Sequence, residues 1–407
     1  MTTIETPVKP SIKGAINDYW SRIRSGDIGS LAAILGLVVL CAVFTVMSPT
    51  FLTPINFANL LTQAAAVIVI AMGLIFVLLL GDIDLSAGYA SGVCGAVMTI
   101  LVTNHGWPWY VAFGLSVIVG VALGTSIGWL VAYLGIPSFV VTLAAFLGFQ
   151  GLLLLLAGEG GTIPMTQPTV LKIENSNISV TNSWILFVVC AVLYVLSGLR
   201  KMQLRRKQGL KVELMQLWVL KTASLLALCA FAVYVLNLER SNNPKLISLK
   251  GTPYIVPVIL LILVVGTFFL QRTAFGRHLY AVGGNAEAAR RAGINVKRVR
   301  TMAFVICSGM AAVAGLIFAS RQNSISPTTG GSSTLLYAVG AAVIGGTSLF
   351  GGRGKMRDAV LGGLVVATID NGMGLLGFSS GTQYLVTGGV LLLSASVDAI
   401  SRKGAAV

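Results

Sequence analysis

Three aspartates stand out because they lie beside or within long apolar segments. Asp82 and Asp84 are one residue apart at the boundary between two apolar runs, and Asp370 lies well inside another run. A carboxylate costs about 3 kcal/mol at the centre of a membrane-spanning helix, so such residues face protein or a wet cavity. Two carboxylates could also indicate glycosidase chemistry, but nothing around them excludes water or holds a substrate. The aspartates therefore indicate a structural or polar-lining role.

The other reactive side chains offer no catalytic or metal-binding pattern. His105 and His278 are far apart in the chain, and all five cysteines lie within apolar runs, where a thiol packs as a small apolar group. A phosphate-binding loop needs Gly-Lys followed by Ser or Thr, but Lys355 is followed by Met356. We therefore expect no catalytic residue, no metal site, no cofactor and no ATP hydrolysis by this chain itself.

The elements that carry these residues are expected to be membrane-spanning helices. Of the 407 residues, 56% are hydrophobic and only 10% are charged, and the mean hydropathy is +0.88. A bilayer accepts that much apolar surface, whereas a soluble domain cannot bury it. The apolar runs cover residues 31–47, 61–80, 85–103, 109–134, 138–157, 183–199, 216–238, 254–271, 301–320, 335–350, 359–377 and 383–400. They lack the alternation of barrel strands, so we expect an all-α polytopic membrane protein with ten to twelve transmembrane helices.

The basic residues gather in alternate loops. A cytoplasmic N-terminus places 23 of the 28 lysines and arginines on the inner side. They are Lys9, Lys13, Arg22 and Arg24, the basic residues from Arg200 to Lys221 and from Arg272 to Arg300, then Arg353, Lys355, Arg357, Arg402 and Lys403. The net charge of +15 thus follows the positive-inside rule and does not indicate nucleic-acid binding.

The same pattern divides the chain into three parts. Residues 1–30 lack the apolar core and cleavage site of a signal peptide, so we expect a cytoplasmic tail. Residues 31–400 are expected to form the transmembrane domain, and residues 401–407 a second cytoplasmic tail.

Local patterns predict three further features. Gly120, Gly124 and Gly128 repeat every four residues and give one helix a smooth face for close packing. Residues 158–182 are rich in Gly, Pro, Asn and Thr, which predicts an external loop with a short surface helix. That loop serves either as a connector or as a contact for an extracytoplasmic partner. Residues 200–250, with the runs on either side, predict an additional hairpin.

The polar, basic segment 272–300 separates two apolar runs and predicts one short helix. Asn285 is a good N-cap, Glu287 suits the first turn, and Gly293 supplies a left-handed stop. A helix of about two turns is unstable alone in water, so its flanks or a partner must hold it. The alternative is a solvated loop that only sets the topology.

Several motifs resemble one family of membrane proteins. Glu287-Ala288-Ala289 followed by Gly293 is similar to the EAA-type loop of bacterial ABC importer permeases. The wider segment 272–285 resembles the sugar branch of that family, which contains ribose, arabinose, galactose and xylose permeases. Further similar segments follow the same order, namely 81–88, 136–143, 344–352 and 370–373. The additional hairpin is most similar to the xylose permeases.

This resemblance implies a type II-like ABC importer permease in the bacterial inner membrane. It further implies a homodimer that works with a cytoplasmic ATP-binding subunit and a periplasmic sugar-binding protein, and that carries D-xylose or a related monosaccharide. Coupling to the ATPase is then expected at Gly283, Gly284, Asn285, Glu287, Ala288, Ala289, Arg290 and Gly293. The translocation pathway or its gate is expected at Asp82, Asp84, Ser86, Thr142, Asp370 and Asn371.

Some alternatives stay open at this point. Asp82 and Asp84 lie at the cytoplasmic surface with Asp84 or Ser86 capping a helix, or they line a cavity in a broken helix. Asp370 either bonds a neighbouring helix or lines the pathway. A stand-alone proton-coupled sugar transporter would use Asp84 or Asp370 as its proton carrier. A membrane enzyme or a lipid transporter would need a reactive cluster at the membrane surface, which the sequence lacks.

Overall fold

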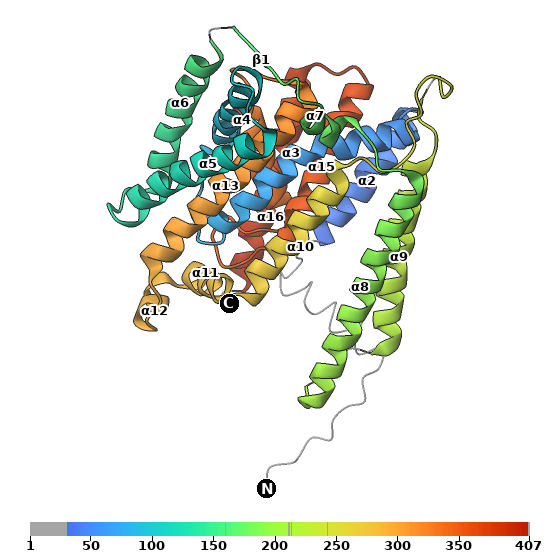
Figure 1. Cartoon of the computed structure of the whole chain (residues 1–407). Coiled ribbons are helices and arrows are strands. Elements are labelled where there is room, and N and C mark those ends of the chain that lie inside the picture. Colours follow the sequence, from blue (N-terminus) through green and yellow to red (C-terminus); the bar gives the residue numbers. More distant parts are fainter. Residues whose placement is uncertain (1–30, 159, 211, 213, 242, 406–407) are drawn as a thin grey trace. The chain divides into compact units, whose positions relative to one another are not determined.

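A computed structural model describes residues 31–158, 160–210, 212, 214–241 and 243–405, and the described chain is largely helical (Figure 1). Its long helices are α2 (Leu31–Met47), α3 (Pro54–Leu78), α4 (Ala87–Thr103), α5 (Trp109–Ala132), α6 (Ser138–Ala157), α8 (Val180–Lys207), α9 (Met215–Asn237), α10 (Ile255–Arg272), α13 (Val296–Gln322), α14 (Ser332–Gly345), α15 (Met356–Leu375) and α16 (Ser380–Ala405). Each coincides with one expected apolar run, and the predicted all-α fold is confirmed.

The short elements lie between the long helices. They are α7 (Pro168–Asn175), α11 (Ala274–Gly284), α12 (Ala286–Arg291) and the strands β1 (Ile163–Pro164) and β2 (Ser324–Ile325). The two strands pair antiparallel, with Ile163 opposite Ile325. The segment 158–182 therefore holds a strand as well as the expected short helix. That helix buries one side, with Val170 and Glu174, while Pro168, Thr169, Lys172 and Asn175 are exposed.

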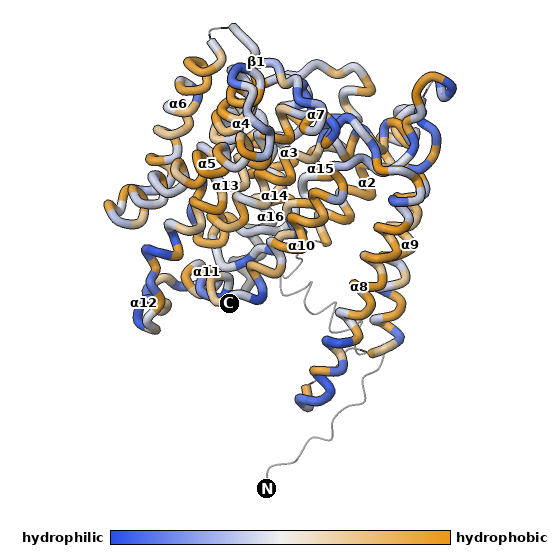
Figure 2. The backbone as a smooth tube through the Cα atoms, in the orientation of Figure 1, coloured by the Kyte–Doolittle hydropathy of each residue, from blue (hydrophilic) through white to orange (hydrophobic). Residues whose placement is uncertain are grey.

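Among the described residues, seven helices are long and apolar enough to cross a bilayer, namely α3, α5, α6, α8, α9, α10 and α13. The helices α2, α4 and α14 are shorter but also apolar. Figure 2 shows the apolar character along these helices and the hydrophilic residues that gather on α12 and at the end of α8. These observations support a polytopic membrane protein, while the total of ten to twelve spans stays a prediction.

The described chain forms two compact units. The hairpin unit contains residues 177–252 and 400–405, and the bundle unit contains residues 31–176 and 253–399. Within the hairpin unit, a Cβ on Gly198 of α8 would lie 2.7 Å from the Trp218 ring of α9, so the indole ring packs directly on the α8 backbone at this glycine. The Arg240 guanidinium donates hydrogen bonds to the carbonyl oxygens of Leu236 and Gly251, both at 2.9 Å. These bonds join the last turn of α9 to the loop that follows it.

The bundle unit is built around α13, which packs against α3, α4 and α5. The glycine stripe on α5 faces α13, as a smooth helix face predicts. A Cβ on Gly120 would lie 2.6 Å from the Ser308 carbonyl oxygen, and one on Gly124 would lie 2.5 Å from that of Phe304. Because real Cβ atoms do not approach so closely, the stripe is needed for the contact between these helices.

Three expected boundaries need correction. The run 335–350 ends as a helix at Gly345, because Gly346 adopts a φ of 117° and turns the chain. The segment 272–300 holds α11 as well as α12, so it contains two short helices rather than one. The helix α16 extends through residue 405, so residues 401–405 of the expected tail continue that helix, and their cytoplasmic position stays a prediction. Residues 1–30, including Lys9, Lys13, Arg22 and Arg24, and residues 406–407 lie outside the described residues.

Candidate coupling and pathway sites

Three consecutive helix starts around residues 272–300 are fixed by local side-chain caps. The Thr273 hydroxyl accepts from the Gly276 amide at 3.1 Å and begins α11. The Asn285 side chain accepts from the Ala288 amide at 2.9 Å and begins α12, as predicted. The Asn295 side chain begins α13 in the same way. The hydroxyl and amide caps satisfy amides that a helix start leaves unpaired, so this segment is ordered by its own sequence.

The helix α12 presents most of its surface outward. Of its six residues only Ala289 is buried, while Asn285, Ala288 and Gly293 around it are exposed. Gly293 has a φ of 85°, which agrees with the left-handed stop that the sequence predicts. Such a helix offers a compact, exposed contact to another molecule.

A small network of charges covers α12. The Glu287 carboxylate accepts hydrogen bonds from Arg290 at 3.0 Å and from Arg291 at 3.1 Å, and all three side chains are more than half exposed. These hydrogen bonds hold the pKa of Glu287 below its ordinary value. Exposed pairs of this kind contribute little stability, so the charges are available for a partner.

The glycines that precede α12 have different surroundings. A Cβ on Gly283 would overlap the Leu79 carbonyl oxygen at the end of α3, whereas a Cβ on Gly284 would meet nothing within 4 Å. The Gly352 amide donates to the same Leu79 oxygen at 2.9 Å, and the Tyr280 hydroxyl donates to the Gly354 carbonyl oxygen at 2.6 Å. The helix α11 thus contacts both the end of α3 and the turn that precedes α15.

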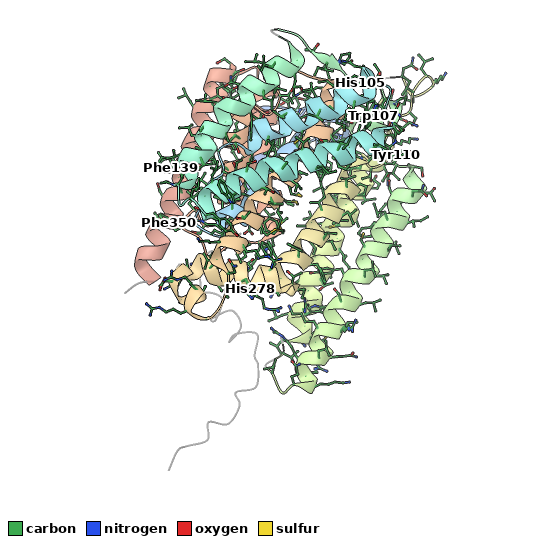
Figure 3. The ribbon with its side chains drawn as sticks, turned by 60° about the vertical axis from the view of Figure 1, so that its left-hand side comes forward. His105, Trp107, Tyr110, Phe139, His278 and Phe350 are labelled. Atoms are coloured by element: carbon green, nitrogen blue, oxygen red, sulfur yellow. The ribbon has the colours of Figure 1, made fainter. Side chains whose placement is uncertain are left out.

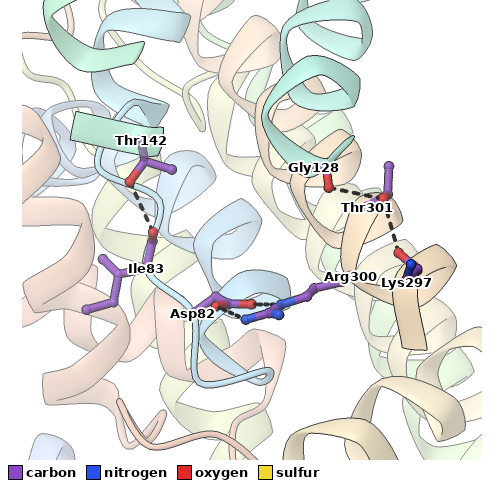
Figure 4. Close-up of polar contacts among 7 residues, drawn as sticks. All are labelled: Asp82, Ile83, Gly128, Thr142, Lys297, Arg300 and Thr301. Carbon is purple, nitrogen blue, oxygen red and sulfur yellow. Dashed lines mark hydrogen bonds and ion pairs between the residues drawn. The ribbon is translucent and has the colours of Figure 1, made fainter. Parts of the chain in front are cut away.

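The loop between α3 and α4 contains both aspartates of the first motif, and both are buried, with exposures of 4% for Asp82 and 0% for Asp84. Neighbouring parts of the protein therefore cover both carboxylates, and whether they lie at the cytoplasmic surface or line a cavity stays a prediction. The Arg300 side chain of α13 binds Asp82 through two hydrogen bonds, from Nε at 2.6 Å and from Nη2 at 2.7 Å (Figure 4). Asp82 and Arg300 thus join this loop to the start of α13.

Asp84 instead forms hydrogen bonds within its own loop. Its Oδ1 accepts from the Ser86 amide at 2.9 Å and from the Ser86 hydroxyl at 2.6 Å, while Oδ2 has no partner among the described residues. Burial raises the pKa of this carboxyl. Ser86 occupies the N-cap position of α4, but its side chain does not cap the helix, because the hydroxyl is used by Asp84.

Thr142 contacts the same loop from α6. Its hydroxyl lies 3.3 Å from the Ile83 carbonyl oxygen and 2.9 Å from that of Ser138 (Figure 4). Three predicted residues, Asp82, Asp84 and Thr142, therefore lie at or beside one loop.

The second pair of candidate residues lies elsewhere in the bundle unit and has two different roles. Asn371 of α15 exchanges two hydrogen bonds of 2.9 Å with Asn56 of α3 and donates a third to Gln63 at 3.1 Å. These bonds join two helices and use the polar groups of Asn371. Asp370 is only partly buried, and its carboxylate lies near the Tyr337 hydroxyl of α14 and the Arg321 guanidinium of α13.

The histidines do not approach each other. Figure 3 shows His105 near Trp107 and Tyr110 at one end of the bundle unit and His278 in α11 at the other. Among the described residues no group of three His, Cys, Asp or Glu side chains could hold a metal ion.

Sequence reasoning missed Arg300 and Asn56 as partners of Asp82 and Asn371, and it missed Tyr280 as the residue that joins α11 to the turn before α15. The signal for α11 was present, since Thr273 is a good N-cap before a helix-compatible segment. The partners Arg300 and Asn56 left no local signal, because they lie 218 and 315 positions from the residues they bind.

Comparisons with known proteins extend over nearly the whole chain. Residues 56–395 match the family described as branched-chain amino acid transport system / permease component. The xylose transport system permease protein of Escherichia coli (strain K12) is 34% identical over 385 residues, or 94% of this chain and 95% of that protein. Its counterpart from Haemophilus influenzae is 33% identical over 94% of this chain and 99% of that protein. The ribose import permease protein of Bacillus subtilis is 30% identical over 92% and 94%, respectively. No solved structure matches the chain.

Proposed function

Since the chain belongs to the family of branched-chain amino acid transport system / permease components, we propose that it is the membrane-spanning subunit of an ATP-driven monosaccharide importer. The observation that carries the proposal is the similarity to xylose and ribose permeases over more than nine-tenths of the chain. The resemblance to sugar permeases expected from the motifs is thereby confirmed.

D-xylose is the proposed cargo, with a related pentose or hexose as the broader class. The xylose permeases share 33–34% identity with this chain, and the ribose permease of Bacillus subtilis shares 30%. A permease of this kind needs only a weakly polar path, because an uncharged sugar must leave as readily as it enters. Tight recognition would then belong to a separate periplasmic sugar-binding protein.

A cytoplasmic ATP-binding subunit would supply the energy. The sequence has no phosphate-binding loop of its own, since Lys355 is followed by Met356. The helix α12 suits the role of the docking element, because it is exposed, short and fixed by caps at its start. On this proposal the residues from Gly283 to Gly293 face the ATPase, with Glu287 and Arg290 at the contact.

The assembly would be a homodimer in the bacterial inner membrane, with both chain ends in the cytoplasm. The distribution of lysines and arginines supports this orientation. It also supports a cytoplasmic position for α12, because the loop from Arg272 to Arg300 is one of the basic ones.

The pathway would use the loop from Asp82 to Ser86, Thr142 and the neighbourhood of Asp370. Partial exposure of Asp370 supports contact with the path, because a half-covered carboxylate cannot face lipid. Asn371 fits a structural role better, because its bonds to Asn56 and Gln63 join two helices.

The decisive experiment is reconstitution. The chain is placed in liposomes alone, or with its co-purified ATPase and binding protein, and uptake of labelled D-xylose is measured with and without ATP. We expect uptake only in the complete, ATP-supplied system. Uptake by the chain alone, driven by a proton gradient, would instead establish the stand-alone transporter.

A variant of α12 tests the docking element. Glu287→Lys removes both ion pairs on α12 and reverses the charge, so we expect the ATPase to dissociate or ATP hydrolysis to continue without uptake. Membrane insertion and the melting temperature of the permease should not change, because Glu287 is exposed. Normal uptake in this variant would remove α12 from the proposed contact.

A further inference from the structure

The Asp82–Arg300 ion pair is a direct polar contact between distant parts of the bundle unit. Its two hydrogen bonds measure 2.6 and 2.7 Å and join residues 218 positions apart. Two parallel bonds between a guanidinium and a carboxylate fix the orientation of both groups as well as their distance. Asp82 is 4% exposed whereas the Arg300 side chain is 37% exposed, so water and salt reach this pair from the arginine side only.

On the side of Arg300, the pair is connected to α12 through a short bonded turn. The Gly293 amide donates to the Arg290 carbonyl oxygen and the Ile294 amide to that of Ala289, both at 3.0 Å. Asn295 then starts α13, and Arg300 follows in its second turn. Because few unbonded residues separate the two helices, a displacement of α12 is carried into the start of α13.

On the side of Asp82, the pair is connected to three helix ends. The Asp82 amide donates to the Val77 carbonyl oxygen of α3 at 3.3 Å, and the same loop leads directly into α4. The Thr142 hydroxyl, near the start of α6, donates a hydrogen bond to the Ile83 carbonyl oxygen of this loop. A force on Asp82 therefore acts on the ends of α3, α4 and α6 together.

The second contact between the coupling segment and α3 is of a different kind. Gly283 packs against the Leu79 carbonyl oxygen with no room for a side chain. Such steric packing transmits a push but does not itself resist separation, and the Tyr280 hydroxyl bond joins α11 to the turn before α15 rather than to α3. An ion pair with two hydrogen bonds resists separation as well, so it can transmit a pull.

We propose that the Asp82–Arg300 pair carries the return movement of α12 to the loop between α3 and α4, which makes Arg300 a positioning residue for transport. The inference rests on the proposed function, in which an ATPase moves α12. An importer alternates between two states, so its coupling segment must both push and pull on the spans. The Gly283 contact supplies the push, and the ion pair supplies the pull.

The test uses the complete complex of permease, ATPase and binding protein in liposomes. The variants are Asp82→Asn, Arg300→Gln and the double variant, which leaves no unpaired buried charge and so avoids the folding loss that a single change causes. ATP hydrolysis and sugar uptake are measured in the same vesicles and expressed as sugar transported per ATP. Arg205→Gln, which changes an exposed arginine of α8, is the matched control.

We expect the double variant to assemble and hydrolyse ATP but to lose about tenfold or more in sugar per ATP, in line with usual coupling energies. Arg300→Lys keeps the charge but loses the two-pronged geometry, so it should retain part of the coupling. The control should match the wild type.

A merely structural pair would give another result, namely less assembled complex with an unchanged ratio of sugar to ATP. That result, or a double variant with the wild-type ratio, overturns the inference. Failure of the proposed function is distinguishable, because the wild-type complex itself would then show no ATP-dependent uptake.

Discussion

The packing of α7 against α13 should weaken as the pH rises, and replacing Glu174 with glutamine should remove this dependence on pH. The Glu174 side chain lies on α7 with an exposure of 7%, and neither carboxylate oxygen has a hydrogen-bond partner among the described residues. Burial raises the pKa of Glu174 to about 8, although the nearby Arg321 guanidinium acts in the opposite direction. The carboxyl is therefore held neutral near pH 7 and below.

The magnitude follows from linkage between protonation and folding. The folded protein holds this proton more tightly than the unfolded chain does, so the stability is complete below the ordinary pKa of 4.5. It falls as the pH rises, and the loss is complete above about 8. The loss is on the order of 3 kcal/mol at pH 7 and at most about 5 kcal/mol above pH 8. Glutamine cannot ionise, so the variant should keep its stability across this range.

The docking of α7 gives a local readout. The Glu174 amide donates to the Ser320 hydroxyl at 3.0 Å, and the Asn175 side chain donates to the Ser320 carbonyl oxygen at 2.7 Å. Protection of the α7 amides against hydrogen exchange, corrected for the intrinsic pH effect, should fall between pH 5 and pH 8 in the wild type. This protection should stay constant with pH in Glu174→Gln, and at pH 5 it should equal the protection in the wild type. An equal fall in both proteins would refute the assignment of the effect to this carboxyl.

Three further substitutions test the packing by thermal melting of the purified chain. Gly283→Ala should lower stability by about 1–3 kcal/mol, because the new Cβ overlaps the Leu79 carbonyl oxygen, whereas Gly284→Ala should melt as the wild type. Gly124→Ala should cost a similar amount through its contact with Phe304, and Gly114→Ala, in open space on the same helix, should cost nothing measurable. Asn371→Leu should cost about 1–3 kcal/mol by leaving the buried side-chain oxygen of Asn56 without the Asn371 donor. Melting temperatures that do not separate each glycine pair, or no loss on changing Asn371, would contradict these contacts.

Local features of the site were predictable because their causes are local. Asn285 caps α12 through an amide three residues away, and Gly293 ends the segment with its left-handed backbone. Both depend on residue type and short spacing, which one sequence displays directly. The glycine stripe of α5 was also predictable as a packing face, although the sequence did not indicate that its partner is α13.

The roles of the polar residues were less predictable, because they depend on what lies opposite. Ser86 looks like a helix cap in the sequence, but its hydroxyl is used by Asp84. Asn371 and Asp370 are neighbours in the chain, yet one joins α15 to α3 and the other stays partly exposed. Adjacent residues on a helix point in different directions, so a motif does not give them a common role.

The sequence alone predicts that the chain forms long apolar helices, where they lie, and where α12 begins and ends. The reason is that lipid leaves the backbone no partner outside its own helix, so apolar length alone selects this structure. Only the tertiary structure decided that Asp82 meets Arg300, that Asn371 meets Asn56 and that Gly283 touches Leu79. Such contacts depend on which helices become neighbours. Packing in space sets that choice, and no spacing along the chain records it.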